Sequence, residues 1–221
     1  MSETTPFNAS LSEPQAEAIL AGLQQADGPA QLLARQDEDT SIPPVVLVDN
    51  ETGETAPGAY DGVTHLWVQL SNTATTAGDL APIDALGLKW GLAIRAPGGG
   101  SLRSAGTDSA FTDLEGLSGH DHLDGLGLQK LVAITSLDGL EALPSLKSLS
   151  VYYCGKLKDI SALTRLPSIT KLTLGESPEL TDLSPVSTLT QLTELRVSAQ
   201  ELTDLSFVSG CSALEDLAVK N

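Results

Sequence analysis

The chain has 221 residues, and its 29 aspartates and glutamates against 12 lysines and arginines give a formal net charge of −17 at pH 7. Such an acidic chain is poorly suited to bind nucleic acid, because phosphate contacts need a basic surface. Hydrophobic residues make up 41% of the chain, yet only eight residues are aromatic and 38 are leucine. This composition points away from immunoglobulin-like sandwiches and toward a leucine-spaced repeat. We expect any macromolecular partner to be neutral or basic.

The acidic residues are concentrated at the start of the chain. Residues 1–60 hold ten acidic residues and a single basic one, Arg35. The first residues have neither the basic n-region nor the apolar h-region of a secretory signal, and no apolar run approaches the roughly 18 residues of a transmembrane helix. We therefore expect a cytoplasmic protein with no membrane partner. In a reducing compartment, Cys154 and Cys211 are expected to stay unpaired.

The N-terminal quarter predicts a helical cap. Residues 11–35 have a helical pattern with a capping box at Ser12, and after a break we expect a second short helix at residues 30–36. Residues 45–48 predict a strand. A repeat protein needs a polar-faced cover over its first unit, so we interpret residues 1–62 as an acidic tail and helical cap. The alternative is that this segment is an acidic partner-binding module.

The rest of the chain repeats. Three segments that begin L-x-D-[IL]-S, at Leu157, Leu180 and Leu202, start 23 and 22 residues apart. Each carries apolar residues in the same columns and closes on an L-x-L or L-x-V pair. Each pair predicts a short strand, and the leucines at spacing three predict a 3₁₀ turn or short helix on the opposite side.

Further units precede these three. Two of them extend the register upstream to residue 111, and another runs from Leu80 to Ile94 with Lys89 in one of the apolar columns. About eleven residues are inserted after it, between residues 95 and 110. The apolar residues Leu66 and Val68 are interpreted as one more strand pair.

This pattern resembles the leucine-rich-repeat family, in the 22- to 23-residue variety of bacterial internalin-like proteins and of the phosphatase-regulator class. The resemblance covers about residues 64–221. It implies an α/β solenoid, a right-handed horseshoe with short parallel strands on its concave face and 3₁₀ or short helices on its convex side. We expect about six to seven rungs within residues 63–221, in one structural domain. The family's asparagine three residues after the strand pair is replaced by Cys154, Ser177 and Gln200, so its hydrogen bonds must be made by other side chains or be partly missing.

The aspartate of each L-x-D-[IL]-S segment recurs at the start of the convex side, as Asp159, Asp182 and Asp204. A repeated acid can indicate calcium, but calcium needs six to eight oxygens that converge on one point. We interpret the aspartate and serine of each segment as features of the turn, with the serine capping backbone N–H groups.

Metal and catalytic chemistry have little support. His120 and His122 form an H-x-H pair of a kind that zinc can use, but His120 occupies a core column. We therefore predict no metal, no cofactor and no enzymatic activity, because no histidine accompanies a plausible serine or cysteine nucleophile. The alternative is a metal- or small-ligand-binding enzyme subunit built on these histidines and the glycine-rich segment 95–110.

The concave sheet is the predicted binding surface. Exposed strand aromatics have no core to explain them, and Trp, Tyr and Arg are enriched at interface hot spots. The candidate partner-binding residues are Trp67, Arg95, Gln129, Tyr152, Tyr153, Lys171, Thr173, Glu194, Arg196 and Lys220.

These features predict a non-catalytic protein–protein interaction module. A role that fits the charge is a cytoplasmic bacterial inhibitor or immunity protein that neutralises a basic toxin or enzyme, since charge attraction speeds capture. The alternative is an internalin-like surface adhesion protein. Only two residues follow the last strand at residues 217–219, so we also expect a homodimer through this C-terminal rung.

Overall fold

The computed structural model describes residues 7–35, 44–56, 58–63, 65–72, 74, 76–95, 111–198 and 204–220. The strands are β1 Phe7–Leu11, β2 Ala30–Arg35, β3 Val45–Asp49, β4 Gly58–Val63, β5 His65–Ser71, β6 Trp90–Arg95, β7 Leu123–Gln129, β8 Ser148–Tyr152, β9 Lys171–Gly175, β10 Glu194–Ser198 and β11 Asp216–Lys220. The helices are α1 Glu13–Leu23 and α2 Ala81–Asp84, with 3₁₀ helices η1 Glu115–Leu117, η2 Leu140–Ala142, η3 Ser161–Arg165, η4 Ser184–Thr188 and η5 Ser206–Val208. Among these described residues, no helix is long and apolar enough to span a bilayer.

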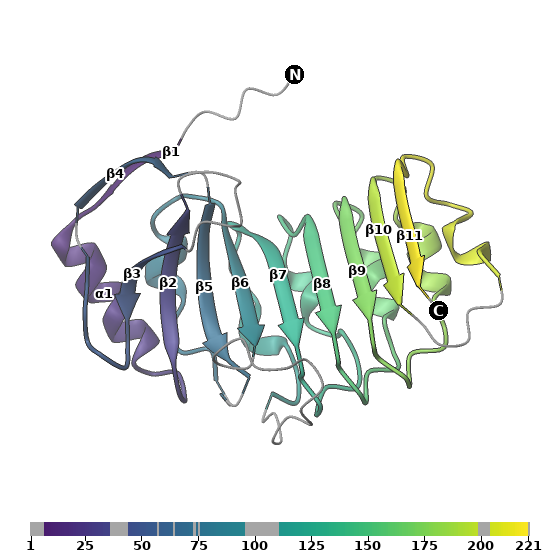
Figure 1. Cartoon of the computed structure of the whole chain (residues 1–221), viewed down its shortest axis with the longest axis horizontal. Helices are drawn as coiled ribbons and strands as arrows, with labels where there is room; N and C mark the ends of the chain where they lie inside the picture. Colours follow the sequence, from purple (N-terminus) through teal and green to yellow (C-terminus); the bar gives the residue numbers. More distant parts are fainter. Residues whose placement is uncertain are drawn as a thin grey trace.

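Nine strands form one sheet in the order β11-β10-β9-β8-β7-β6-β5-β2-β3, and β1 pairs with β4 in a small second sheet (Figure 1). Strands β5 to β11 are all parallel. One leucine column runs in register across β7 to β11, with members 22 or 23 residues apart: Leu126, Leu149, Leu172, Leu195 and Leu217. The predicted repeat is therefore confirmed, and each repeat supplies one strand to the sheet.

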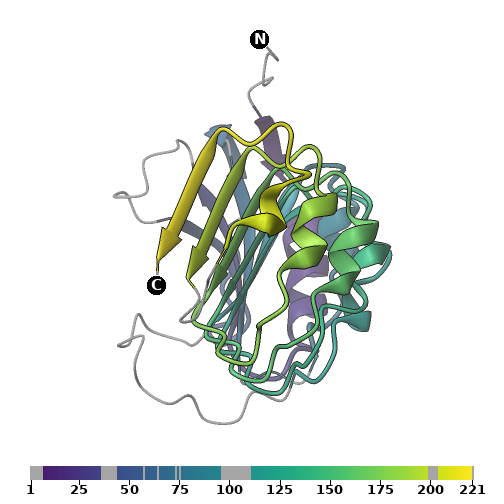
Figure 2. The same ribbon diagram turned by 90° about the vertical axis from the view of Figure 1, so that its right-hand side faces the viewer.

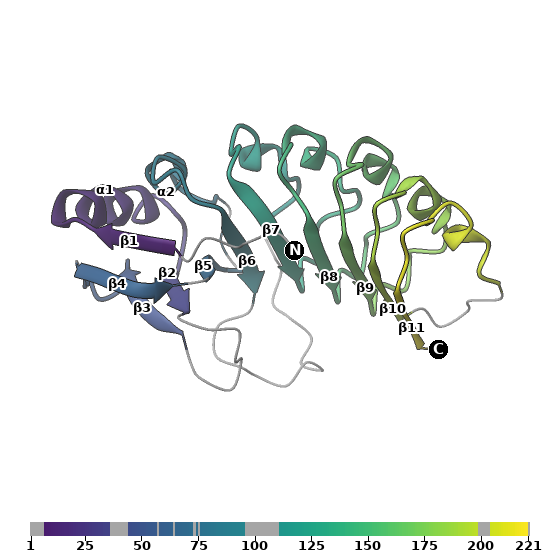
Figure 3. The ribbon, with the colours of Figure 1, turned by 90° about the horizontal axis from the view of Figure 1, so that it is seen from above.

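The sheet forms the inner side of a curved solenoid, and the 3₁₀ helices lie along its outer side (Figure 3). The view along the solenoid shows strands on one side and 3₁₀ helices on the other, joined by turns (Figure 2). Leucines at spacing three, such as Leu140, Leu143 and Leu146, are fully buried between the two sides. One continuous apolar core extends from Leu11 to Cys211. This is the leucine-rich-repeat solenoid expected from the repeat.

The predicted second N-terminal helix is wrong, because residues 30–35 form strand β2. Helix α1 is confirmed and ends at Leu23, and Gln15 Oε1 accepts a 2.9 Å hydrogen bond from the Ser12 backbone N–H as expected of a capping box. Strand β2 pairs antiparallel with β5 and buries Ala30, Leu32 and Ala34 in the core. The core residues of β2 follow the strand period of two, although Leu33 between them is also buried, outside the core cluster. Pairing with β5 decided between strand and helix.

The N-terminal edge of the sheet is covered by the chain itself. The predicted strand at residues 45–48 is confirmed as β3, which pairs antiparallel with β2. Beyond β3 the chain folds back, so that Asp49 N donates to Glu54 O at 3.0 Å and Ala56 N donates to Leu47 O at 2.6 Å. A covered edge does not recruit further strands.

The first parallel strand has a different register from the predicted one. Val68 and Leu70 align with Leu92 and Ile94, rather than Leu66 and Val68. Because this shift is two residues, the same side chains still face the core.

The next rung also departs from the repeat at one column. Lys89 is exposed, and the neighbouring Trp90 is buried in its place, next to a shift of register between Trp90 and Gly91. Its indole N–H donates to Asp84 Oδ1 at 3.1 Å. Trp90, one position after Lys89, therefore fills the leucine column, and the register shift between β6 and β7 accommodates it.

The two cysteines are buried and free. Cys154 Sγ lies 3.6 Å from Tyr152 O, and Ser177 Oγ donates to Gly175 O at 3.3 Å. Each side chain thus contacts the carbonyl two residues before it, in place of the family's asparagine. Burial raises the pKa of the Cys154 thiol to about 11, so this thiol stays protonated at neutral pH.

The repeated aspartates cap the 3₁₀ helices. Asp159, Asp182 and Asp204 accept hydrogen bonds from the backbone N–H of the serine two residues later, at 2.8, 2.9 and 2.7 Å. The structural interpretation of these segments is confirmed, although the aspartate and not the serine is the acceptor. Hydrogen bonds from this serine lower the pKa of all three aspartates: its side chain has the larger effect at Asp182 and Asp204, and its backbone N–H has the larger effect at Asp159.

We predict that Asp182→Ala lowers the free energy of unfolding by about 1 kcal/mol, because one backbone N–H loses its acceptor. Asp182→Asn keeps an oxygen acceptor and should cost less. Since the folded-state pKa is below the unfolded one, the charge contributes stability above the unfolded pKa of about 3.9, and this contribution is lost as pH falls through the folded pKa. Urea unfolding of both variants between pH 7 and 3 measures this, with Glu179→Ala as the control for loss of an exposed carboxylate. If the difference in free energy of unfolding between wild type and Asp182→Asn were the same at pH 3 as at pH 7, the prediction would be contradicted.

Candidate partner-binding surface

The ten candidate residues lie on the concave side of the sheet or at the turns that follow the carboxyl ends of its strands. Strand β5 carries Trp67, and β6 and β7 end on Arg95 and Gln129. The later strands carry Tyr152, Lys171, Thr173, Glu194, Arg196 and Lys220, and Tyr153 follows β8 directly. Alternation along each strand turns these side chains away from the buried leucine columns.

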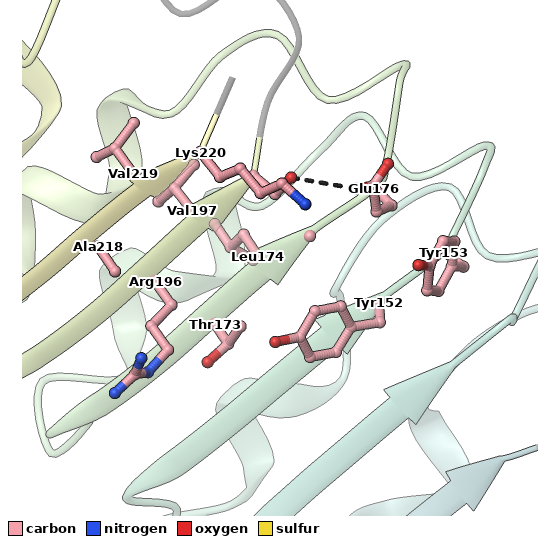
Figure 4. Close-up of a pocket in the computed structure, with 12 residues that line it drawn as sticks. Tyr152, Tyr153, Thr173, Leu174, Glu176, Arg196, Val197, Ala218, Val219 and Lys220 are labelled. Atoms are coloured by element: carbon pink, nitrogen blue, oxygen red, sulfur yellow. Dashed lines mark hydrogen bonds between the residues drawn. The ribbon is translucent and has the colours of Figure 1, made fainter. Parts of the chain in front are cut away.

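Five of the ten residues meet around one depression in the concave face. Tyr152, Tyr153, Thr173, Arg196 and Lys220 line a hollow of about 320 Å³ across β8 to β11 (Figure 4). Residues far apart in the sequence meet there because the parallel register places Tyr152, Gly175, Ser198 and Lys220 side by side. We call this hollow the tyrosine depression.

Tyr152 lies flat over a glycine. A Cβ atom at position 175 would lie 2.6 Å from Cδ1 and Cε1 of the Tyr152 ring, so only glycine leaves room for the ring in this position. The side chain stays 36% exposed. The ring centroid of Tyr153 is 6.4 Å away and tilted by 32°. The two rings together present a rigid aromatic surface to solvent.

Charged residues form a chain of ion pairs beside the depression. Lys171 Nζ lies 3.7 Å from Glu194, Arg196 Nε lies 2.8 Å from Glu194, and Arg196 Nη2 lies 3.2 Å from Asp216. The hydrogen bond from Arg196 lowers the pKa of Glu194. Two carboxylates therefore fix the guanidinium and neutralise its charge, a feature that the sequence alone did not reveal.

Trp67 occupies a separate part of the same face. A Cβ atom at Gly91 would lie 2.4 Å from Cε3 of its indole, and one at Gly125 would lie 3.0 Å from Cη2. The indole thus spreads over the glycines of two neighbouring strands.

Arg95 and Gln129 are also outside the lining of the tyrosine depression. Arg95 borders a smaller hollow of about 170 Å³ with Gln31, Glu51 and Gln69. Gln129 lies beside Tyr152 in the register of β7 and β8. The structure therefore does not gather all ten residues in one place.

The histidine pair does not form a metal site with other side chains in the described part of the chain, where no cluster of three or more His, Cys, Asp or Glu could hold an ion. His120 packs edge-on against the buried Trp90, with ring centroids 5.7 Å apart. His122 Nδ1 lies 3.3 Å from Asp84 Oδ1. Of the glycine-rich segment 95–110 only Arg95 lies within the described residues.

The candidate list lacked two residues that complete the depression. Glu176 and Ser198 line it, and Ser198 Oγ donates to Glu176 Oε1 at 3.3 Å. Glu176 has φ of 50°, and Tyr153 and Lys130, 23 and 46 residues earlier, have φ of 57° and 58°. The same left-handed turn therefore follows successive strands. The constant 23-residue spacing of these three positions could have shown that they are equivalent. The residue types did not indicate a left-handed turn, because non-glycine residues rarely adopt this conformation.

We predict that Gly91→Ala moves the Trp67 indole off the sheet and costs roughly 1–3 kcal/mol of stability, because the new methyl group overlaps the ring. Gly127→Ala is the matched control on the same face, since its nearest neighbours would lie at an ordinary 3.9 Å. Near-ultraviolet circular dichroism and tryptophan emission report the ring's environment. Identical spectra for wild type and Gly91→Ala would contradict the ring position.

A scan against protein-family models found no match, and neither did a search of curated proteins. Among solved structures, the chain is similar to internalin C2 of Listeria monocytogenes str. 4b F2365, with 19% sequence identity, coverage of 77% of this chain and 81% of that chain, and a TM-score of 0.40. It is also similar to the internalin InlF of the same strain, with 17% identity, coverage of 99% and 73%, and a TM-score of 0.31. Its own 22- to 23-residue spacing, parallel register and outer 3₁₀ helices make this chain a leucine-rich-repeat solenoid.

Proposed function

We propose that this chain is a non-catalytic protein-binding module whose partner contacts the tyrosine depression. The proposal rests on one observation: Tyr152, Tyr153 and Arg196 meet around one hollow. Their side chains lie on the face of the sheet opposite the core, so packing of the core does not explain them. Tyrosine and arginine are the residue types that dominate interface energies. A flat ring beside an oriented guanidinium suits a protein surface with an apolar anchor and a polar rim.

The surface is rigid before the partner arrives. Tyr152 rests against the backbone of Gly175, and Arg196 is tied to carboxylates on two strands. Both side chains belong to strands paired on each side. Association then loses little side-chain entropy, so more of the contact energy appears as affinity.

Charge near the depression is balanced. Lys171, Arg196 and Lys220 are matched by Glu176, Glu194 and Asp216 within the same strands and turns. The acidic excess is densest in residues 1–60, where ten acidic residues accompany one basic residue, while the other 161 residues hold nineteen acidic and eleven basic residues. We infer that aromatic contacts at the depression hold the partner, while the N-terminal quarter attracts a basic region of it from a distance.

The finer role that we propose is that of a bacterial inhibitor or immunity protein that binds a basic toxin or enzyme. The net charge of −17 supports a basic partner. The competing role is surface adhesion in the manner of an internalin. Recovery of the chain in the cytoplasmic fraction and a toxin reading frame beside its gene are expected for the first role, whereas recovery in the cell wall or medium is expected for the second.

We predict that Tyr152→Ala weakens partner binding by about 30-fold or more, the loss expected from a hot-spot side chain worth about 2 kcal/mol. Affinity capture with wild type and variant baits identifies the partner, and calorimetry on the purified pair measures the dissociation constant. Gly175→Ala should also weaken binding, because it displaces the same ring. Gly127→Ala adds the same methyl group elsewhere on the face and should bind like wild type. A partner that binds all four proteins equally would disprove the proposed surface.

We predict that Glu17→Lys and Glu51→Lys together slow association roughly tenfold at low salt, because both exposed acids belong to the acidic quarter. Dissociation should change little, since electrostatic steering acts mainly on the encounter. Stopped-flow or surface-plasmon measurements at 20 and 500 mM salt separate the two rates. Association that depends on neither salt nor these residues would remove the basic-partner proposal and leave the tyrosine depression untouched.

A further inference from the structure

The outermost strand of the solenoid, β11, has an open edge. It pairs with β10 on one side, and no strand of the described residues pairs with its other side. Leu217 and Val219 continue the buried columns of Leu195 and Val197, yet they are 37% and 40% exposed. An exposed strand edge with apolar side chains is a template for a further strand.

We propose that two copies of this chain pair through β11 as antiparallel strands, with a two-fold axis at Ala218. Each copy then supplies the strand that the other lacks, and the two sheets become one. This contact borders the tyrosine depression, because Ala218, Val219 and Lys220 line one side of it. It does not depend on the partner proposed for the depression, because the chain alone would form the dimer.

Hydrogen-bond direction selects this register. Asp216 N donates to Thr193 O on the β10 side at 3.0 Å. Backbone groups point to alternate sides along a strand, so those of Leu217 and Val219 point away from β10. With the axis at Ala218, Leu217 of one copy faces Val219 of the other, and these outward groups form hydrogen-bonded pairs on both sides of the axis. Their side chains also lie together on the apolar face.

The charges of the strand are self-complementary in the same register. In the sequence Asp216-Leu-Ala-Val-Lys220, the axis at Ala218 places Asp216 of each copy opposite Lys220 of the other. These are non-hydrogen-bonded pairs, in which side chains approach most closely. Both residues are exposed on the concave side. An axis at Leu217 or Val219 keeps the hydrogen-bond alternation but loses both charge pairs.

The opposite end of the sheet explains why the contact closes as a dimer. On the outer side of β3, residues 47–49 are covered by the segment that returns through Glu54 and Ala56, while Val45 and Val46 stay exposed. A head-to-tail filament would need that edge, and a two-fold contact uses only β11. The structure thus favours a closed pair over open growth.

A single cysteine tests the register. Ala218→Cys places two thiols across the axis, where the Cα atoms of a non-hydrogen-bonded pair are about 4.5 Å apart, within the range of a disulfide. We expect a covalent dimer on a non-reducing gel after mild oxidation. Ser150→Cys is the control, because Ser150 lies in the same row three strands inward. Cys154 and Cys211 are present in both proteins and are buried. Equal cross-linking of the two variants overturns the register.

Charge reversal tests the pairing in the absence of a covalent bond. Sedimentation equilibrium should give twice the 22.9 kDa chain mass for wild type. Lys220→Asp or Asp216→Lys alone should weaken the dimer at least tenfold. The double variant Asp216→Lys/Lys220→Asp should restore part of the loss, because the charge pairs between copies re-form while the new lysine at position 216 also faces Arg196 of its own copy. Val219→Pro removes one outward N–H that the dimer needs and should also give a monomer. It leaves the hydrogen bonds between β11 and β10 in place, because the N–H of Val219 points away from β10. A wild-type monomer at 100 μM, or a double variant no better than either single variant, overturns the proposal.

Discussion

No rung of this solenoid can bury its own leucines, and the whole structure depends on that constraint. A strand of five residues and a 3₁₀ turn enclose too little volume to exclude water, so Leu140, Leu143 and Leu146 become fully buried only when the rungs on both sides are stacked. The 22- to 23-residue spacing keeps this stacking in register. Insertions or deletions that change the spacing therefore act on several rungs at once, while substitutions on the concave face leave the core intact.

The same constraint makes the ends of the stack different from its middle. At the start, β2, β3 and the returning segment complete the sheet and cover its edge, and helix α1 covers the core. At the other end, β11 has apolar residues at the positions that are buried in the other strands, but these residues are partly exposed. In the dimer that we propose, its self-complementary charges make this exposed rung a specific contact rather than an aggregation site.

Stacking also orders the surface that we propose binds the partner. Because strands stand side by side at fixed spacing, a ring on one strand can rest on a glycine of the next, as Tyr152 does on Gly175 and Trp67 on Gly91. Ion pairs cross the strands in the same way, from Lys171 through Glu194 and Arg196 to Asp216. The paired strands and the stacked core thus hold the side chains of the concave face in place, although these side chains are not part of the core.

Several features could be predicted from the sequence because they depend on local periodicity. The columns around Leu149 and Leu172, the strand at residues 45–48, the cap at Ser12 and the concave location of Tyr152 all follow from spacing alone. Spacing of two or three residues states which side a residue faces, and tertiary contacts did not change that side.

Other features were decided only by tertiary structure. Residues 30–35 became a strand because β5 offered a pairing edge, and Trp90 replaced Lys89 in the core because a bulge moved it there. The sequence also listed Tyr152, Arg196 and Lys220 as separate candidates. Only the parallel register brought them around one depression and bound Arg196 to its two carboxylates, because distances between rungs are set by strand pairing and not by position along the chain.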